Sequence, residues 1–416
     1  MSVVSRGWFQ PLGYLVLLVT IWVSLSGAAD AASPRRPPTV LATATDLTGA
    51  AERMISYRHQ EHMWQTADGA LHLVYNRGAL QPGPGLVLFS SFDGGSTWSF
   101  MLNFANTDDE STADGVLQGD DLSLVYPTAD GSIAFAELHY NSVVRSWSFT
   151  SAATAFSSSQ WVALNPALGV DSTGTIWCAF VVRERTNWRK DTNIRMVNRV
   201  SGGPFWTDTG LVFGPTDDQS VERSARPVRT ANGMGMVYSV RGSTFWATRA
   251  NGMPDNVPWT VSTIYVSPYA TSPKFDPYAS HFSVATDDSN TIHMVLADNF
   301  QVLYFRHSGA GPWTPAVMLD TGGKKAGYPQ IGVVNGKLAV AFSLHQGDKG
   351  LLLVSADGGV TFPTAAQLAH PAASGGVTYG TARVETPTRT TGVLTVLQQY
   401  EDNGLQRLML FTVPPP

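Results

Sequence analysis

The chain of 416 residues has a single cysteine, Cys178, so it cannot form an internal disulfide. Charged residues make up only 14% of the chain and the formal net charge is −5. The chain therefore lacks the basic surplus that binding to nucleic acid requires, and we expect no nucleic-acid partner. It also lacks Cys/His spacings typical of a metal centre and a glycine-rich phosphate loop, so we expect neither a metal nor another cofactor.

Long apolar runs are rare, and the clearest one, residues 12–25, lies at the N-terminus. It follows the single early charge, Arg6, and precedes the small residues around positions 26–32. This pattern predicts a secretory signal peptide over residues 1–31, followed by a Pro- and Arg-rich spacer over residues 32–38. We therefore expect a secreted, extracellular protein. The alternative is a protein anchored in a membrane by an uncleaved N-terminal helix.

Turn and strand formers are abundant instead, with 39 glycines and 25 prolines. Seven short turns, six of them containing glycine, each precede an apolar run rich in β-forming residues. The turns are residues 67–69, 129–131, 172–174, 231–233, 288–290, 334–336 and 390–392.

Large aromatic residues form a second repeat, each opening a short polar β segment. They are 49 to 59 residues apart: Trp98, Trp147, Trp206, Trp259, Trp313 and Phe362. Two landmarks with one period near fifty residues predict an all-β propeller over residues 39–416. We expect a monomer with seven blades of four antiparallel strands, and six blades are the alternative. Residues 39–45 are expected to pair beside residues 407–413 and so close the ring.

Two segments carry the motif S-x-D-G-G-x-T-[WF], in which the aspartate can accept hydrogen bonds from its own turn. We interpret them as structural hairpins. Their residues are Ser91, Asp93, Gly95, Thr97 and Trp98 in the first, and Ser355, Asp357, Gly359, Thr361 and Phe362 in the second.

The topology of a propeller places these hairpins on one face and the candidate site on the other. Residues that enter the innermost strand or leave the second strand should surround the mouth of the central channel. This set is rich in arginine, which suits a carboxylate or sulfate ligand because guanidinium groups bind such anions bidentately. It includes Arg58, His59, Glu61, Arg77, Asp121, Arg185, Glu222, Arg226, Arg241 and Tyr328.

With these motifs the chain resembles the sialidase superfamily, whose propellers carry Asp-box (BNR) repeats. Ser56-Tyr57-Arg58 lies eleven residues before the turn at Gly69, where the family has the first arginine of its carboxylate-binding triad. The resemblance implies that Arg58 and Arg241 bind the substrate carboxylate, with Arg77 and Arg185 as further candidates.

The same resemblance implies a tyrosine nucleophile, Tyr328, with Glu222 as its base. No acidic residue lies between Arg77 and Ser91, where the family carries its general acid, so Asp121 is the candidate for that role.

The function expected from the resemblance is action on extracellular glycans, such as exo-glycosidic release of acidic sugars. A non-catalytic lectin-like propeller and a protein-interaction propeller are the alternatives. Tryptophans such as Trp64, Trp161, Trp188 and Trp246 would be sugar platforms in a lectin, although packing between blades also accounts for them.

Overall fold

In a computed structural model, Pro37–Pro416 form one compact unit. The structure describes residues 37–57, 59–80, 84–109, 111–186, 191–214, 223–240, 242–269, 281–309, 311–344, 349–371, 377–378 and 384–413. The predicted signal peptide lies outside these residues. The described part consists of strands and their connections and contains no helix.

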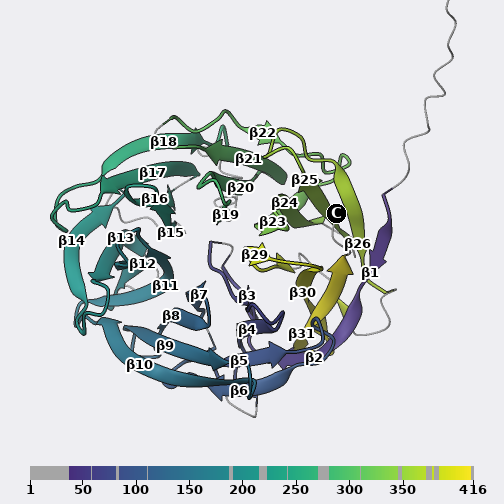
Figure 1. The fold of residues 1–416 in the computed structure, drawn as a ribbon, viewed down its shortest axis with the longest axis horizontal. Helices are drawn as coiled ribbons and strands as arrows, with labels where there is room; N and C mark the ends of the chain where they lie inside the picture. The colour runs from purple at the N-terminus through teal and green to yellow at the C-terminus, as the bar shows by residue number, and fades with distance from the viewer. Residues whose placement is uncertain are drawn as a thin grey trace, which may run out of the picture. The chain divides into compact units, whose positions relative to one another are not determined.

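Six sheets each contain four antiparallel strands that are consecutive in the sequence. Figure 1 shows them arranged around a common centre, with the first strand of each sheet innermost. Their strands are β3 (Met63–Gln65), β4 (Leu71–Asn76), β5 (Leu86–Ser91), β6 (Ser99–Asn103); β7 (Asp114–Gln118), β8 (Asp121–Pro127), β9 (Ile133–Asn141), β10 (Ser146–Phe156); β11 (Trp161–Val170), β12 (Ile176–Glu184), β13 (Asp191–Arg199), β14 (Thr207–Phe213); β15 (Arg223–Thr230), β16 (Gly233–Val240), β17 (Ser243–Ala250), β18 (Thr260–Val266); β19 (Phe282–Thr286), β20 (Ile292–Asp298), β21 (Gln301–His307), β22 (Val317–Met318); and β23 (Ala326–Val334), β24 (Lys337–Leu344), β25 (Lys349–Ser355), β26 (Thr364–Ala369).

A further sheet, the composite sheet, is assembled from both ends of the described chain. Its central strands β30 (Leu394–Asp402) and β31 (Leu405–Val413) are flanked by β2 (Thr43–Gly49) on one side and by β27 (Val377–Thr378) and β28 (Val384–Glu385) on the other. Two short strands, β1 (Thr39–Leu41) and β29 (Arg389–Thr390), instead extend the sheet of β23–β26 by parallel pairing. The described residues thus form an all-β propeller of four-stranded antiparallel blades, with six regular blades and one composite sheet.

The expected closure by residues 39–45 is correct only in part. Thr43 and Ala44 pair with Leu410 and Met409 of β31, as expected. Residues 39–41 pair with residues 367–369 of β26 instead. The N-terminal segment therefore bridges two neighbouring sheets, which covers the edges of both.

Burial follows the position of a strand in its sheet. The second strands are buried on both faces because neighbouring sheets pack against them, and every residue of β4 and of β20 is buried. Outer strands such as β6 and β18 are largely exposed. Trp64 and Trp246 are buried in the clusters between sheets, so packing accounts for both.

Because the strands alternate in direction, the connections fall on two faces. The turn face carries the connections between first and second strands and between third and fourth strands. The loop face carries the remaining connections. The motif turns at residues 91–98 and 355–362 connect third and fourth strands and lie on the turn face, as predicted.

Both motif turns form the predicted network of hydrogen bonds. Asp93 accepts from the Ser91 hydroxyl (2.8 Å), the Thr97 amide (2.9 Å) and the Thr97 hydroxyl (2.7 Å). Gly95 adopts a φ of 98° and its carbonyl accepts from the Trp98 indole at 2.9 Å. The turn at Asp357 repeats the contacts with Ser355 and Thr361. These contacts stabilise hairpins.

One predicted turn is wrong. Residues 129–131 connect the second strand β8 to the third strand β9, and the connection between the first and second strands of this sheet is residues 119–120. An Asp-Gly pair suits a tight turn at either position, so the dipeptide could not distinguish them. Asp121 consequently begins a second strand and lies at the turn face rather than at the loop face where the site was expected.

Candidate functional site

A central cavity of about 610 Å³ lies between the innermost strands. Its walls come from β7, β11, β15 and β19 together with residues 61–67 and residues 388 and 389. Several lining residues, such as Gly119, Val170 and Asp287, lie in or beside the turns that connect the first and second strands of their sheets. The cavity therefore reaches the turn face. The strands approach closely at Gly169, where an added Cβ would lie 2.9 Å from the Pro227 backbone.

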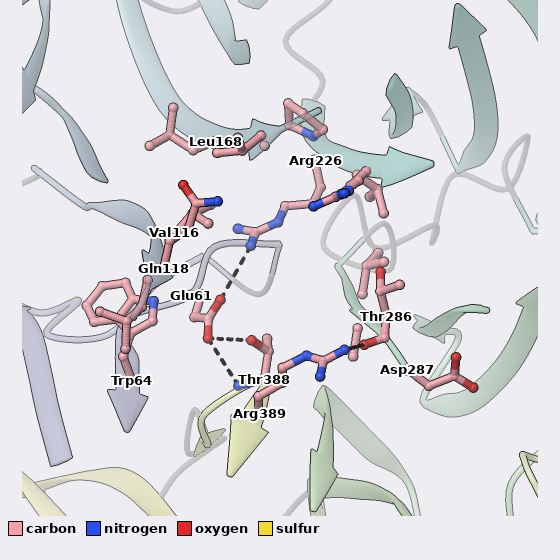
Figure 2. Close-up of a pocket in the computed structure, with 18 of the residues that line it drawn as sticks. Glu61, Trp64, Val116, Gln118, Leu168, Arg226, Thr286, Asp287, Thr388 and Arg389 are labelled. Atoms are coloured by element: carbon pink, nitrogen blue, oxygen red, sulfur yellow. Dashed lines mark hydrogen bonds and ion pairs between the residues drawn. The ribbon is translucent and has the colours of Figure 1, made fainter. Parts of the chain in front are cut away.

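Glu61 is the central ionisable group of this cavity (Figure 2). One carboxylate oxygen accepts hydrogen bonds from the amide (3.1 Å) and the hydroxyl of Thr388. The other oxygen lies 3.6 Å from the Arg226 guanidinium. Burial raises the pKa of Glu61 to about 7 because desolvation outweighs the attraction of Arg226. Near neutral pH, Glu61 can therefore both hold and release a proton.

Arg226 connects Glu61 to a second, fully buried carboxylate. It forms an ion pair with Asp114, whose side chain is 0% exposed, and donates to the His59 carbonyl at 3.2 Å. Asp114 also accepts from the amides of Glu61 (2.7 Å) and Leu168 (2.6 Å). Asp114 on β7 thus joins β11, β15 and the segment that precedes β3, which leaves Glu61 as the more available carboxylate.

The charge balance of the cavity favours an anion. Arg229 is exposed and lines the cavity, and it has no hydrogen-bond or ion-pair partner among the described residues. Arg389 also lines the cavity, although it is paired with Asp288 (2.5 Å) and with the Thr286 carbonyl (2.9 Å). Arg229 can therefore bind a carboxylate or sulfate group without breaking an existing contact.

A buried histidine–glutamate pair supports the segment that carries Glu61. His62 lies 2.9 Å from Glu385 through Nδ1 and 2.8 Å from the Ser56 carbonyl through Nε2. The side chains of His62 and Glu385 are 1% and 0% exposed. Gln330 donates to the second Glu385 oxygen at 3.2 Å. Glu385 of the composite sheet and Thr388, in the connection from β28 to β29, together fix the position of the segment that carries Glu61.

Four of the residues predicted from the sequence are described by the structure, and none of these four lines this cavity: Asp121, Arg77, Arg185 and Tyr328. Arg58, Glu222 and Arg241 lie outside the described residues. Tyr328 is half-buried near the start of β23, with its ring 5.6 Å from that of His281, and does not line the cavity.

The remaining predicted residues have other contacts. Asp121 is exposed and lies 2.8 Å from His139. Arg77 is buried, donates to the Thr48 carbonyl at 3.3 Å and stacks over Phe89. Arg185 donates to the carbonyls of Ser158 (3.0 Å) and Asp130 (2.8 Å) on the loop face.

Glu61 and Arg226 were within the predicted ring of charges but were not singled out. A usable signal was available for Arg226, since it is a charged residue inside an otherwise uncharged stretch, Ser224 to Val228. The approach of Thr388 to Glu61 spans 327 positions and has no sequence signature.

Neither a metal site nor a membrane-spanning helix is found in the part of the chain that the structure describes. No three His, Cys, Asp or Glu residues there are grouped so that they could hold a metal ion. None of the described residues forms a helix long and apolar enough to cross a membrane.

Solved structures share this fold at very low sequence identity. The chain superposes on a polysaccharide lyase of family PL25, an ulvan lyase, with a TM-score of 0.52, 10% identity and coverage of 91% of this chain and 96% of that chain. The same lyase bound to -[GlcA(1-4)Rha3S]- gives a TM-score of 0.50 at 10% identity, covering 87% and 96%. A putative 6-phosphogluconolactonase from Bacteroides uniformis ATCC 8492 gives 0.50 at 11% identity, covering 83% and 98%. These similarities establish the propeller fold.

No protein-family model matches the chain, and no curated protein matches it in sequence. The sialidase resemblance therefore stays an interpretation of its motifs.

Proposed function

We propose that this propeller binds an acidic glycan in its central cavity and acts on it, with Glu61 as the group that transfers a proton. The observation that carries the proposal is a carboxylate with a pKa of about 7, held by Thr388 beside Arg226 in a cavity of about 610 Å³. A general acid or base is most effective when its pKa lies near the working pH. Arg229 supplies an available cation for the anionic group of the sugar.

The similar fold of a lyase bound to -[GlcA(1-4)Rha3S]- agrees with an acidic saccharide as the ligand. It supports the ligand class by analogy of fold, whereas the proton-transfer role rests on Glu61 itself. The predicted signal peptide supports an extracellular setting for this function.

The test compares two variants on uronate-containing and sialic acid-containing oligosaccharides. Glu61→Gln should abolish the release of new reducing ends and retain binding, since the amide cannot exchange a proton with the substrate. Arg229→Ala should weaken binding by about tenfold, the loss expected for one charged hydrogen bond. Arg306→Ala, which removes a partly exposed arginine outside the cavity, is the matched control and should change neither quantity.

Three results would contradict the proposal in distinguishable ways. Undiminished turnover in Glu61→Gln would remove Glu61 from the chemistry. Binding without turnover in the parent protein would favour the lectin-like alternative. Binding of neither glycan class would leave the protein-interaction alternative in place of a glycan function.

The narrower sialidase-like form of the proposal assigns the chemistry to Tyr328, with Arg58 and Arg241 on the substrate carboxylate. Tyr328 has a φ of 53°, a backbone conformation that non-glycine residues seldom adopt outside functional or turn positions. Tyr328→Phe distinguishes the two forms, because it should abolish turnover in a sialidase mechanism and leave turnover through Glu61 intact.

We further propose that the composite sheet is a seventh blade that completes this site. Glu385 in β28 lies on the edge strand of this sheet and contacts His62. Thr388 follows three residues later, in the connection from β28 to β29, and contacts Glu61. Without that segment Glu61 would lose its two hydrogen-bond donors from Thr388.

A further inference from the structure

A second, smaller cavity of about 180 Å³ lies between the sheet of β11–β14 and the sheet of β15–β18. One wall is the turn between β11 and β12, residues 171–175. The opposite wall is residues 249–255, at and after the end of β17. Asn198 on β13 lies in the cavity wall and is paired in register with Trp177. The cavity opens past exposed residues, Thr173 and Asn251, toward the turn face.

The side chain of Asn198 gives this cavity its chemical character. Asn198 is 1% exposed, and neither its amide nitrogen nor its amide oxygen has a hydrogen-bond partner among the described residues. Leaving a buried donor and a buried acceptor without partners destabilises the folded protein, because both groups lose the hydrogen bonds that water would give them. An occupant that both donates and accepts hydrogen bonds would remove this cost.

The walls around Asn198 are held in place by their own contacts. The Trp177 indole donates to Asp171 at 3.0 Å, and the Arg249 guanidinium lies 4.5 Å from the centre of the Trp177 ring. Arg249 also pairs with Asp255 at 3.0 Å and donates to the Met253 carbonyl. The site is therefore preorganised, with Asn198 as its unsatisfied polar group.

We propose that this cavity is a second saccharide site, which binds a sugar ring through two adjacent hydroxyl groups. One hydroxyl donates to the Asn198 oxygen and its neighbour accepts from the Asn198 nitrogen, a pairing that suits a carboxamide opposite a vicinal diol. Met234, Met253 and Val200 supply apolar contacts for the C–H faces of the ring. The choice of a sugar as the ligand rests on the function proposed above. The requirement that the ligand both donate and accept hydrogen bonds rests only on the unpartnered amide of Asn198.

The position of the cavity agrees with an extended glycan as the ligand. Val170 lines the central cavity, and the next residue, Asp171, lines the second cavity. Both cavities approach the turn face, so one oligosaccharide could occupy both, and the second site would then raise the affinity for long chains.

The experiment titrates the protein with a panel of neutral methyl hexosides and methyl 6-deoxyhexosides, using the indole signal of Trp177 in nitrogen–proton correlation spectra as the readout. At least one glycoside should shift this signal. Asn198→Leu, which replaces the amide by an apolar group of similar volume, should weaken that binding at least tenfold. It should not lower the melting temperature in the absence of sugar, because it removes an unsatisfied buried amide.

A second variant and a control keep the result interpretable. Asn198→Asp keeps the size of the side chain and removes its donor, so it should also weaken binding if Asn198→Leu does not fold. Glu61→Gln should leave binding at this site unchanged, so failure of the central site and failure of this one are separable. If no glycoside shifts the Trp177 signal, or if the shift persists in both Asn198 variants, the cavity holds water only and the proposal is wrong.

Discussion

At the scale of single residues, burial determines the pH at which Glu61 ionises. Two neighbouring groups in the same segment respond to burial in opposite directions. The pKa of Glu61 is raised to about 7, and burial lowers the pKa of His59 to about 3. Each shift favours the neutral form, as expected for groups removed from water. Between about pH 3 and about pH 7 both side chains are therefore mainly neutral.

These shifts predict a pH dependence of stability that Glu61→Gln should alter. Between pH 4.5 and about 7 the unfolded protein ionises Glu61 while the folded protein keeps it protonated, so the parent loses stability as pH rises through this window. The loss is up to about 3 kcal/mol, on the order of 1.4 kcal/mol per pH unit. Chemical denaturation of both proteins at several pH values measures it.

Above pH 7 the stability difference between the parent and Glu61→Gln should stay constant. His59 contributes equally to both proteins and cancels, although it opposes the trend in each because its lowered pKa destabilises the fold as pH falls below 6.5. A stability difference that does not change between pH 4.5 and 7 would show that the Glu61 carboxyl titrates normally.

At the scale of structural elements, the motif turns act as stabilisers of hairpins. Sequence reasoning predicted their contacts because all the partners lie within eight residues of one another. Asp93 and Thr97 are exposed, so water reaches these turn contacts. Exposed hydrogen bonds contribute less than buried ones, since water replaces a lost partner.

Asp93→Ala should therefore lower the free energy of unfolding by about 0.5–1.5 kcal/mol, the net contribution of ordinary hydrogen bonds. Thermal unfolding of the variant measures the loss. Glycan binding by the folded fraction should be unchanged because the motif residues do not line the central cavity. Loss of binding at an unchanged melting temperature would place the turn in the binding site instead.

At the scale of the whole molecule, the fold was largely predictable and the site was not. The repeated turns and aromatics specify one four-stranded unit after another, so the propeller follows from local patterns. The site depends on contacts between remote segments, such as Thr388 with Glu61 and Asp114 with Arg226, which no local pattern encodes. The pairing of the N-terminal strand with β31 is equally remote in the sequence, but the need to close the ring of blades predicted it.

Closure of the ring by that strand predicts unequal effects of two leucine substitutions. Leu47 in β2 is 1% exposed and packs with Met54, Leu397 and Leu408, whereas Leu41 in β1 is 68% exposed. Leu47→Ala should cost about 2–5 kcal/mol of stability, the range for emptying a buried leucine site. Leu41→Ala, the matched control, should cost less than about 0.5 kcal/mol. Equal costs in denaturant unfolding would contradict closure by β2.

The pH profile of turnover tests most directly whether Glu61 transfers a proton, because it reports the ionisation of the group that takes part in the reaction. Release of reducing ends from an acidic oligosaccharide should change with an apparent pKa near 7 in the parent protein, the value that burial imposes on Glu61. Glu61→Asp should show reduced turnover that still depends on pH. Glu61→Gln should show no turnover above background at any pH. If turnover by Glu61→Gln changed with pH near 7 as much as turnover by the parent protein does, Glu61 would not be the group that transfers the proton.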